Sequence, residues 1–347
     1  MPEARLLERL WFGEDALARI ARRMLLPLEA LYRAAVGVRE ALYDANLLRS
    51  HAASLPTVSV GNVIVGGTGK TPIAAWIASG LSDRGARPAI VLRGYGEDEP
   101  LVHRVLNPHI PVIACADRLT GVETARRQGA TVAVLDDAFQ HRRIERDVDL
   151  VLVSADRWMS TPRMLPAGPW REPLRAVRRA TLVVVTRKAA TVADADEVNA
   201  ALAAVAPRVP RTTLNLGPKE LLPVAAGDLS RLPLTVLAGR EAHVLVAIAD
   251  PTAFVRQLEA LGSHVSATVY PDHHHFSTTE IERFAQSLSA DGLAICTLKD
   301  AVKLKERWPR QAPPLWYVSQ HVIVERGVGG VDRILDDLAR ARDHTVR

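Results

Sequence analysis

A glycine-rich segment that ends in a lysine and a threonine carries the clearest chemical signal in this sequence. Its core consists of Gly66, Gly67, Thr68, Gly69, Lys70 and Thr71. Glycines let backbone N–H groups turn toward phosphate oxygens, and the N-terminus of a following helix adds a favourable dipole. Lys70 would reach the β- and γ-phosphates, and Thr71 would ligate Mg²⁺. The spacing predicts a phosphate-binding loop for ATP or GTP over residues 64–71. It begins with Ile64 and Val65, where Ile64 replaces the usual first glycine.

Two adjacent carboxylates follow an apolar run later in the chain. Thr131–Leu135 predicts a buried strand, and Asp136 and Asp137 come directly after it. In phosphate-loop folds, an aspartate at the end of such a strand holds Mg²⁺ or one of its waters. Many strands end in aspartate, so a turn or cap carboxylate is the alternative. The pattern does not decide which of the two would contact the metal.

Three consecutive histidines, His273, His274 and His275, follow a predicted strand at Ser266–Tyr270. Adjacent residues seldom converge on one ion, and no cysteine or second histidine cluster completes a set of metal ligands. A catalytic or substrate-contacting histidine in a loop is therefore the preferred interpretation. Metal binding and a surface loop without function are the alternatives.

Two further segments carry charged residues that could act on a substrate. Arg93–Pro100 follows a predicted strand, so in an open parallel sheet it lies at the carboxyl edge, where ligands bind. Asp98 in this segment could orient or deprotonate an attacking hydroxyl, and an acidic surface turn is the alternative. Leu165–Pro173 carries the adjacent Arg171 and Glu172 in a stiff, proline-rich loop, which by itself indicates little.

An alternation of strands and helices positions these segments. The predicted strands of the first part are Thr57–Val60, Ala89–Leu92, Val112–Ala114, Thr131–Leu135, Leu150–Val153 and Leu182–Val185. Helical patterns such as Pro72–Arg84 and Thr120–Gln128 lie between most of them. Short strands that are apolar on both faces indicate a parallel sheet covered on both sides. We therefore predict an α/β fold with a P-loop NTPase-like parallel sheet domain.

A second, smaller α/β pattern follows a proline-rich stretch at residues 205–234, where we place a domain boundary. Its predicted elements are strands His243–Ala249, Ser266–Tyr270, Ala294–Thr297 and Trp316–Val324 and helices Thr252–Leu261, Thr278–Ser289 and Val331–Arg342. We expect the boundary stretch and the strand Trp316–Val324 to act as a hinge between the two domains.

Residues 14–49 predict an amphipathic helical segment, with apolar positions at three- and four-residue steps and several arginines. Pro27 would kink this helix or start a second one. One interpretation is a helix packed on the main domain. The other is a basic amphipathic helix that lies on an anionic membrane.

Composition narrows the class of protein. The net charge of +5 over 347 residues favours acidic partners such as nucleic acid, anionic lipid or phosphorylated substrates. The two cysteines, Cys115 and Cys296, lie in no CxxC spacing, which fits a reducing compartment. We find no signal peptide and no uncharged apolar run of the ~20 residues that a spanning helix needs. These features predict a protein of the cytoplasm or of a membrane's cytoplasmic face.

Taken together, these segments resemble one family, the tetraacyldisaccharide 4'-kinases. The matching motifs, in the order of the family, are GNVIVGGTGKTP (Gly61–Pro72), RGYG (Arg93–Gly96), DEP (Asp98–Pro100), DDAFQHR (Asp136–Arg142), LPAGPWREP (Leu165–Pro173), PDHHHFS (Pro271–Ser277) and TLKDAVK (Thr297–Lys303). The resemblance implies transfer of the ATP γ-phosphate to the 4'-hydroxyl of a tetraacyldisaccharide 1-phosphate, a lipid A precursor. It implies the cofactors ATP and Mg²⁺ and a peripheral enzyme, which we expect to be a monomer although no pattern in the sequence decides the oligomeric state. That enzyme would sit on the anionic cytoplasmic face of the inner membrane and would not bind nucleic acid.

The resemblance also implies roles for single residues. The glycine loop matches the phosphate-binding segment and the acidic pair matches the magnesium-linked residues. Asp98 matches a carboxylate that works with a second-domain histidine to activate the sugar hydroxyl. That histidine corresponds most closely to His273 and less closely to His274. Arg171 and Glu172 match a pair near the reaction centre.

On this basis we divide the chain into four parts. Residues 1–50 form a helical membrane-associating segment, and residues 51–215 form the P-loop kinase core. Residues 216–325 form the smaller α/β domain with linker strands, and residues 326–347 form a C-terminal helix.

The sequence departs from the family pattern at three places. RGYG and DEP lie next to each other here, whereas the family often has a long insertion between them, so a lipid-facing loop is in doubt. Residues 297–300 read TLKD instead of TEKD, and Ala138 replaces a common glycine.

These departures leave open another metabolic P-loop NTPase, such as an ATP-dependent ligase or a GTP-driven metal-insertion protein. Thr186-Arg187-Lys188 is a poor match to the base-reading motif of a GTPase. A non-enzymatic membrane adaptor is the remaining alternative.

Overall fold

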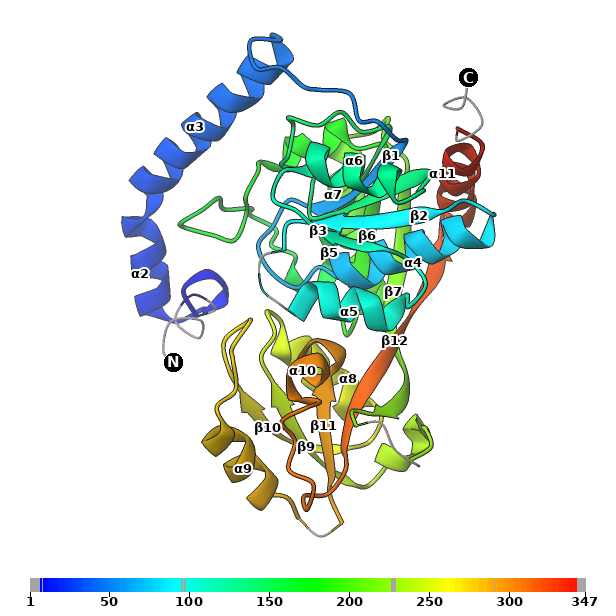
Figure 1. Ribbon diagram of the computed structural model, residues 1–347. Coiled ribbons are helices and arrows are strands. Elements are labelled where there is room, and N and C mark those ends of the chain that lie inside the picture. Colours follow the sequence, from blue (N-terminus) through cyan, green and yellow to red (C-terminus); the bar gives the residue numbers. More distant parts are fainter. Residues whose placement is uncertain are drawn as a thin grey trace.

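Two lobes, joined by a pair of long strands, make up the protein (Figure 1). The computed structural model describes residues 7, 9–94, 96, 98–225, 229–289 and 291–341. Tyr95 and Glu97 in the Arg93–Pro100 segment lie outside the described residues, as do most of the first eight residues and the last six of the predicted C-terminal helix.

The first lobe is a parallel sheet with helices on both faces, as predicted. Its strands are β1 (Thr57–Asn62), β2 (Pro88–Leu92), β3 (Val112–Ala114), β4 (Val132–Asp136), β5 (Val148–Ser154) and β6 (Leu182–Arg187). Every residue of β1, β2 and β4 is buried, because apolar side chains point to both faces and both faces are covered. β1 lies between β4 and β5, so the segment after β1 starts in the middle of the sheet.

Helices on the two faces supply the apolar cover. They are α4 (Lys70–Asp83), α5 (Asp98–Leu106), α6 (Arg118–Arg127), α7 (Val192–Val205) and α11 (Val328–Ala341). α4 and α11 pack on one face with Ile73, Ile77 and Leu335 in the core, whereas α6 and α7 cover the other face. The α/β class and the P-loop-type arrangement of strand, loop and helix predicted from the sequence are therefore confirmed.

One antiparallel ribbon connects the lobes and makes the sheet continuous. β7 (Arg211–Pro223) and β12 (Leu315–Arg326) pair along almost their whole lengths. The proline-rich boundary stretch thus contains a long strand, and Pro218 lies beside a register shift in β12, where a residue without an N–H is tolerated. The boundary between residues 215 and 216 falls inside β7, and the domain division stays a prediction.

The second lobe repeats the α/β pattern on a smaller scale. Its strands are β8 (Leu232–Pro233), β9 (Glu241–Val246), β10 (His264–Val269) and β11 (Leu293–Thr297), and its helices are α8 (Pro251–Ala260), α9 (Thr278–Gln286) and α10 (Leu298–Leu304). α10 packs against α5 of the first lobe. This contact was not foreseen, because the sequence reading assigned no helix to either segment.

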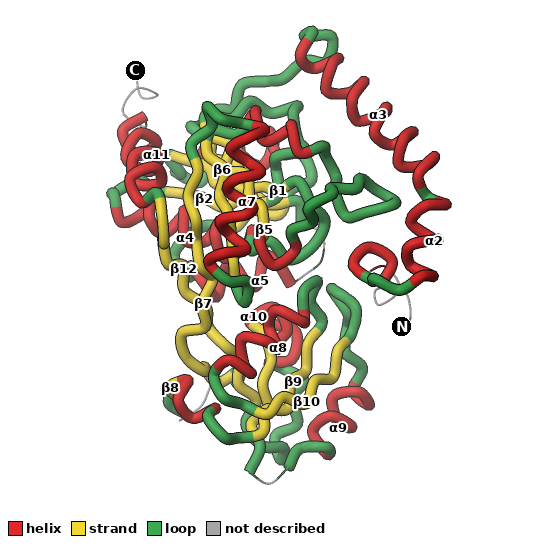
Figure 2. The backbone as a smooth tube through the Cα atoms, turned by 180° about the vertical axis from the view of Figure 1, so that it is seen from behind, coloured by secondary structure: helices red, strands yellow, loops and turns green. Residues whose placement is uncertain are grey.

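Two helices, α2 (Ala16–Met24) and α3 (Leu26–Asp44), form an arm beside the first lobe, as seen from opposite sides in Figures 1 and 2. The helices meet at Leu25, and Pro27 stands in the first turn of α3, so this proline starts a second helix. The arm ends at Asp44, whereas the prediction extended to residue 49. None of the described helices is both long enough and apolar enough to cross a bilayer.

Candidate active site

The glycine loop bridges the carboxyl end of β1 and the first turn of α4, as its sequence predicts. α4 begins at Lys70, and Gly69 before it has a φ of +88°, a left-handed conformation that favours glycine. A Cβ atom at Gly69 would lie 2.2 Å from Leu216 Cδ1, so no other side chain fits without displacement. The first N–H groups of an α-helix have no partner within the helix, so the start of α4 after this loop suits the binding of an anion.

Ile64 and Val65 support this loop from the protein side. Ile64 is fully buried in the core and pairs with Trp170 through a β-bridge. The Val65 N–H donates to the Pro169 carbonyl oxygen at 2.8 Å. Both residues therefore hold the loop on the Leu165–Pro173 segment, and their contact with the nucleotide stays a prediction.

Side chains from neighbouring strands fix the rest of the loop. Asn62 Nδ2 donates to Thr68 Oγ1 at 2.9 Å, and Thr186 Oγ1 donates to the Thr68 carbonyl oxygen at 3.0 Å. Lys188 Nζ donates to the Gly67 carbonyl oxygen at 2.7 Å. Lys188 thus adds a positive charge beside the glycine loop, and only a poor match to a base-reading motif marked it in the sequence.

Arg157 of the first lobe contacts Asp250 of the second lobe beside the same loop. Arg157 is 5% exposed, and its Nη1 lies 3.3 Å from the Ala249 carbonyl oxygen and 3.7 Å from Asp250 Oδ1. A Cβ at Gly66 would lie 3.4 Å from Arg157 Nε. No sequence motif includes Arg157. Its only signal in the sequence is its position shortly after the predicted strand Leu150–Val153.

The acidic pair divides into a buried and a partly exposed member. Asp136 is buried, and its Oδ2 accepts a hydrogen bond from Nε2 of the fully buried His103 at 2.9 Å. Its Oδ1 has no hydrogen-bond partner among the described residues. Asp137 has a φ of +52°, which turns its side chain toward Lys70, with Asp137 Oδ1 3.7 Å from Lys70 Nζ. Burial raises the pKa of Asp137, but the charges of Lys70 and Arg171 outweigh it and the net shift is downward.

Arg171 and Glu172 do not form a pair, although the sequence reading treated them as one. Arg171 donates to both carboxylate oxygens of Asp137 at 3.2–3.3 Å and to Gln140 Oε1 at 3.2 Å. Glu172 is 3% exposed and contacts Arg179, with Glu172 Oε2 2.5 Å from Arg179 Nη2. Burial raises the pKa of Glu172 and outweighs the opposing charge of Arg179. The side chains of Arg171 and Glu172 point to opposite sides of their loop. Only Arg171 therefore joins Lys70 in contact with the Asp137 carboxylate.

Asp98 and His273 meet where the lobes touch. His273 Nδ1 donates to Asp98 Oδ1 at 3.0 Å, and Lys299 Nζ lies 3.1 Å from His273 Nε2 and 3.8 Å from Asp98 Oδ2. Asp98 is 4% exposed, and its Oδ2 has no hydrogen-bond partner among the described residues. A buried carboxylate oxygen of this kind can accept a hydrogen bond from a substrate hydroxyl.

The pKa values of this pair shift in opposite directions. Burial raises the pKa of Asp98, but the hydrogen bond from His273 and the charge of Lys299 outweigh it, so the pKa lies below its ordinary value. The hydrogen bond to Asp98 raises the pKa of His273, and burial opposes this effect only in part. Both shifts favour an ionised carboxylate beside a protonated imidazole.

The neighbouring histidine lies outside this arrangement. His274 Nε2 is 3.1 Å from Glu280 Oε2, and its ring stacks on Tyr270 with centroids 4.5 Å apart. His273 is therefore the histidine that pairs with Asp98. Lys299 was missed as a partner, because the sequence marked its segment only as a departure from a family motif.

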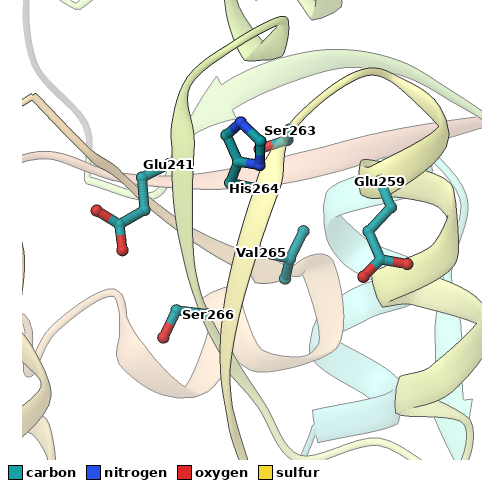
Figure 3. A pocket seen from close by; sticks show the side chains of 6 residues that line it. All are labelled: Glu241, Glu259, Ser263, His264, Val265 and Ser266. Carbon is teal, nitrogen blue, oxygen red and sulfur yellow. The ribbon is translucent and has the colours of Figure 1, made fainter.

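One pocket belongs to a different edge of the molecule. A cavity of about 560 Å³ lies at the amino ends of β9 and β10 and includes Glu241, Glu259 and His264. Figure 3 shows the two carboxylates on either side of the strand that carries His264. Since these groups do not converge, we place the site at the carboxyl edge, where the glycine loop, Asp137 and Asp98 lie.

Thr71, Asp136 and Asp137 are the residues predicted to hold Mg²⁺. Among the described residues, no three His, Cys, Asp or Glu side chains converge into a metal cage. Mg²⁺ usually binds one or two carboxylates and completes its shell with phosphate oxygens and water. Asp136 Oδ1, which has no hydrogen-bond partner among the described residues, and the Thr71 hydroxyl fit a site that the ion shares with the nucleotide.

Comparisons with known proteins point to one family. The family model described as tetraacyldisaccharide-1-P 4'-kinase (LpxK) matches residues 21–339. The tetraacyldisaccharide 4'-kinase of Anaeromyxobacter dehalogenans (strain 2CP-C) is 37% identical over 326 residues, which cover 86% of each chain. That of Halorhodospira halophila is 35% identical over 316 residues, covering 85% of this chain and 87% of the relative. A crystal structure of LpxK from Aquifex aeolicus in complex with ATP has a TM-score of 0.69 at 28% identity, covering 92% of this chain and 99% of that one.

Proposed function

Because the chain belongs to the tetraacyldisaccharide-1-P 4'-kinase family, we propose that it transfers the γ-phosphate of ATP to the 4'-hydroxyl of a tetraacyldisaccharide 1-phosphate. The contact between Asp98 and His273 is the observation that carries the proposal. It provides a buried carboxylate on the same edge of the sheet as the glycine loop. In phosphoryl transfer the protein mainly positions the reactants and neutralises charge, which suits this set of residues.

The proposed roles follow from the surroundings of each side chain. Residues 66–71 hold the phosphates, and Lys70 neutralises charge on the transferred group. Asp98 Oδ2 accepts the proton of the sugar hydroxyl, while His273 holds the carboxylate in place from its other oxygen. Arg171 is held in place by its ion pair with Asp137, and its guanidinium contacts a phosphate oxygen of the bound nucleotide. Glu172 supports this loop from its buried side.

Thr71, Asp136 and Asp137 would hold the Mg²⁺ that accompanies ATP. When bound, the ion draws charge from the β- and γ-phosphates and helps to align the γ-phosphate for attack. The residues of this chain contribute the oxygen ligands. Lys70 and Arg171, which contact Asp137, balance the negative charge of the acidic pair before the nucleotide binds.

The arm of α2 and α3 supports a peripheral position on the cytoplasmic face of the inner membrane. Its exposed side carries large apolar residues, including Leu17, Met24 and Leu31, each more than 60% exposed. α2 also carries arginines that can contact anionic head groups. The acceptor lipid resides in a bilayer, so an arm of this type brings the site to its substrate. We expect the enzyme to act there as a monomer.

The ribbon of β7 and β12 is the proposed hinge through which the second lobe closes on ATP. Arg157, Asp250 and Lys299 lie at the surfaces that such a motion would bring together or separate. Small-angle scattering of the purified protein with and without ATP and acceptor measures the motion. An unchanged radius of gyration would contradict it.

The decisive experiment uses labelled ATP and a tetraacyldisaccharide 1-phosphate. We expect a labelled lipid that carries the new phosphate at the 4'-position, and competition by ATP but not by GTP. The Lys70→Ala variant, folded but inactive, is the control. Labelled phosphate released into water with no labelled lipid would indicate a different NTPase of the same fold.

A further inference from the structure

One side of the α2–α3 arm, which we call its inner side, forms hydrogen bonds with the loop that carries Arg171. The Tyr32 hydroxyl donates to the Arg171 carbonyl oxygen at 3.0 Å. Glu29, which is 3% exposed, accepts a hydrogen bond from the Met164 N–H at 3.1 Å. Glu29 and Tyr32 lie three residues apart on α3, so they project from one face of the helix. Both ends of the loop are thus bound to the same side of one helix.

Further contacts tie the arm to the active site at two other points. Trp11 Nε1, before α2, donates to the Pro166 carbonyl oxygen at 3.0 Å. Arg39 Nη2 donates to the Gln140 carbonyl oxygen at 2.6 Å. The side chain of Gln140 in turn accepts a hydrogen bond from Arg171. The arm and the residue Trp11 before it therefore contact both the loop that carries Arg171 and the segment of Gln140, which binds its guanidinium.

The outer side of the same arm is apolar and exposed. Its large apolar side chains are between 52% and 75% exposed and recur at steps of three or four residues, namely Leu17, Ile20, Met24, Leu28 and Leu31. A continuous apolar stripe of this kind costs free energy in water and is stabilised when it enters a lipid surface. One rigid element therefore joins the surface proposed to meet the membrane and the loop with Arg171.

We propose that Glu29 and Tyr32 are positioning residues for Arg171, and that seating the arm on an anionic lipid surface orders the loop and raises turnover. This inference rests on the proposed function. A bilayer can favour one conformation only by binding it better. The arm bound to the loop presents the whole stripe as one flat face, whereas a detached arm presents it in varied orientations. A displaced Arg171 would lower the rate, because small errors in position at a reacting centre are costly.

The test uses a short-chain tetraacyldisaccharide 1-phosphate that stays monomeric in water, together with empty phosphatidylglycerol vesicles. We expect the vesicles to raise kcat of the wild-type protein on this soluble acceptor. At saturating vesicles, Tyr32→Phe and Glu29→Ala should lose about two- to tenfold in kcat, the range for one lost hydrogen bond, with an unchanged KM for ATP. They should also need more vesicles to reach saturation, because their arm is less often in the conformation that the bilayer binds better. Glu29→Gln keeps an acceptor for the Met164 N–H and should restore most of the rate.

A matched variant separates membrane binding from loop positioning. Leu28→Gln combined with Leu31→Gln changes only the outer stripe, so it should lose vesicle binding and the vesicle-dependent rise while its basal kcat stays unchanged. Hydrogen exchange gives a readout that does not depend on activity. Vesicles should slow exchange of the Met164 amide in the wild-type protein but not in Glu29→Ala.

Three outcomes would overturn the inference. The first is a wild-type protein that does not bind the vesicles. The second is one that binds them without a change in Met164 exchange. The third is a Tyr32→Phe variant whose kcat equals that of the wild type with and without vesicles. A wild-type protein that shows the exchange effect but phosphorylates neither soluble nor vesicle-borne acceptor would instead count against the proposed function alone.

Discussion

His273 Nδ1 lies 3.0 Å from Asp98 Oδ1, so a single hydrogen bond joins two residues that are 175 positions apart and belong to different lobes. The carboxylate lies at the start of α5 in the first lobe, and the imidazole lies in the loop after β10 in the second. Lys299 contacts both groups from α10. The lobes therefore meet through the residues that we propose to act on the acceptor hydroxyl.

Asp98→Asn removes the carboxylate that accepts the proton of the acceptor hydroxyl, while the size of the side chain and most of its packing stay the same. We expect kcat to fall by about 10²–10⁴-fold, the usual effect of losing a general base, with little change in KM for ATP. Initial rates at saturating acceptor measure this. His274→Gln is the matched control and should retain the wild-type rate, because His274 contacts Glu280 and Tyr270 instead. Equal losses in both variants would argue against the assignment.

Lys70→Ala removes the ammonium group at the start of α4. Without it, charge on the transferred phosphoryl group is poorly neutralised, and we expect kcat to fall by at least about 10²-fold. Circular dichroism should remain unchanged, since Lys70 is partly exposed and its ion pair with Asp137 is long, at 3.7 Å. Undiminished turnover in a folded Lys70→Ala protein would exclude the proposed role of the glycine loop.

Arg171→Lys keeps the charge but loses the planar fork that spans both oxygens of Asp137. We expect kcat to fall by about 10- to 100-fold, which corresponds to one or two lost charge-assisted hydrogen bonds. Arg175→Lys, an exposed change near the same loop, should leave kcat unchanged. If the two variants have the same activity, the contact between Arg171 and Asp137 has no part in the reaction.

Arg179→Ala should destabilise the fold, because it leaves the buried Glu172 carboxylate without its partner. Loss of one member of a buried pair costs about 3 kcal/mol or more in free energy of unfolding. Since burial already raises the pKa of Glu172, the loss should shrink toward low pH as this carboxyl takes up a proton. Urea unfolding at two pH values measures both effects. Combining Arg179→Ala with Glu172→Leu should recover part of the stability.

The opposite pKa shifts of His273 and Asp98 predict how their contact depends on pH. The raised pKa of His273 means that its contribution to stability is complete below its ordinary value of 6.5 and is lost as pH rises through the higher folded value. The lowered pKa of Asp98 means that its contribution is complete above 3.8 and is lost as pH falls through the lower folded value. The thermal midpoint should therefore fall more between pH 6 and 9 in the wild type than in His273→Gln. Parallel pH profiles would contradict this.

Several features followed from the sequence because their causes are local. The glycine loop needs a residue with positive φ at Gly69, and the lysine after it begins a helix, so the pattern is written in neighbouring positions. The strands of the first lobe are buried on both faces, which produces unbroken apolar runs. Such signals depend on backbone conformation and side-chain periodicity within about ten residues. They were enough to predict the fold class and the family.

Other features could not be foreseen because they depend on the path of the chain. Arg171 and Glu172 are adjacent in sequence, yet one contacts Asp137 and the other is buried against Arg179. The proline-rich stretch taken as a boundary contains a strand, because β12 supplies the partner that its backbone needs.

The sequence by itself determined which residues bear the chemistry and which elements carry them. The tertiary structure decided which of those residues touch. From the sequence alone, Asp98 could also belong to a surface turn, and His273 was preferred to His274 only by resemblance. The packing of α5 against α10 and the hydrogen bond between Asp98 and His273 decide both points. The reason is physical. A helix or a loop is set by interactions between near neighbours, whereas a contact between lobes is set by the strands that connect them and by the buried surface between them. No short pattern records that arrangement.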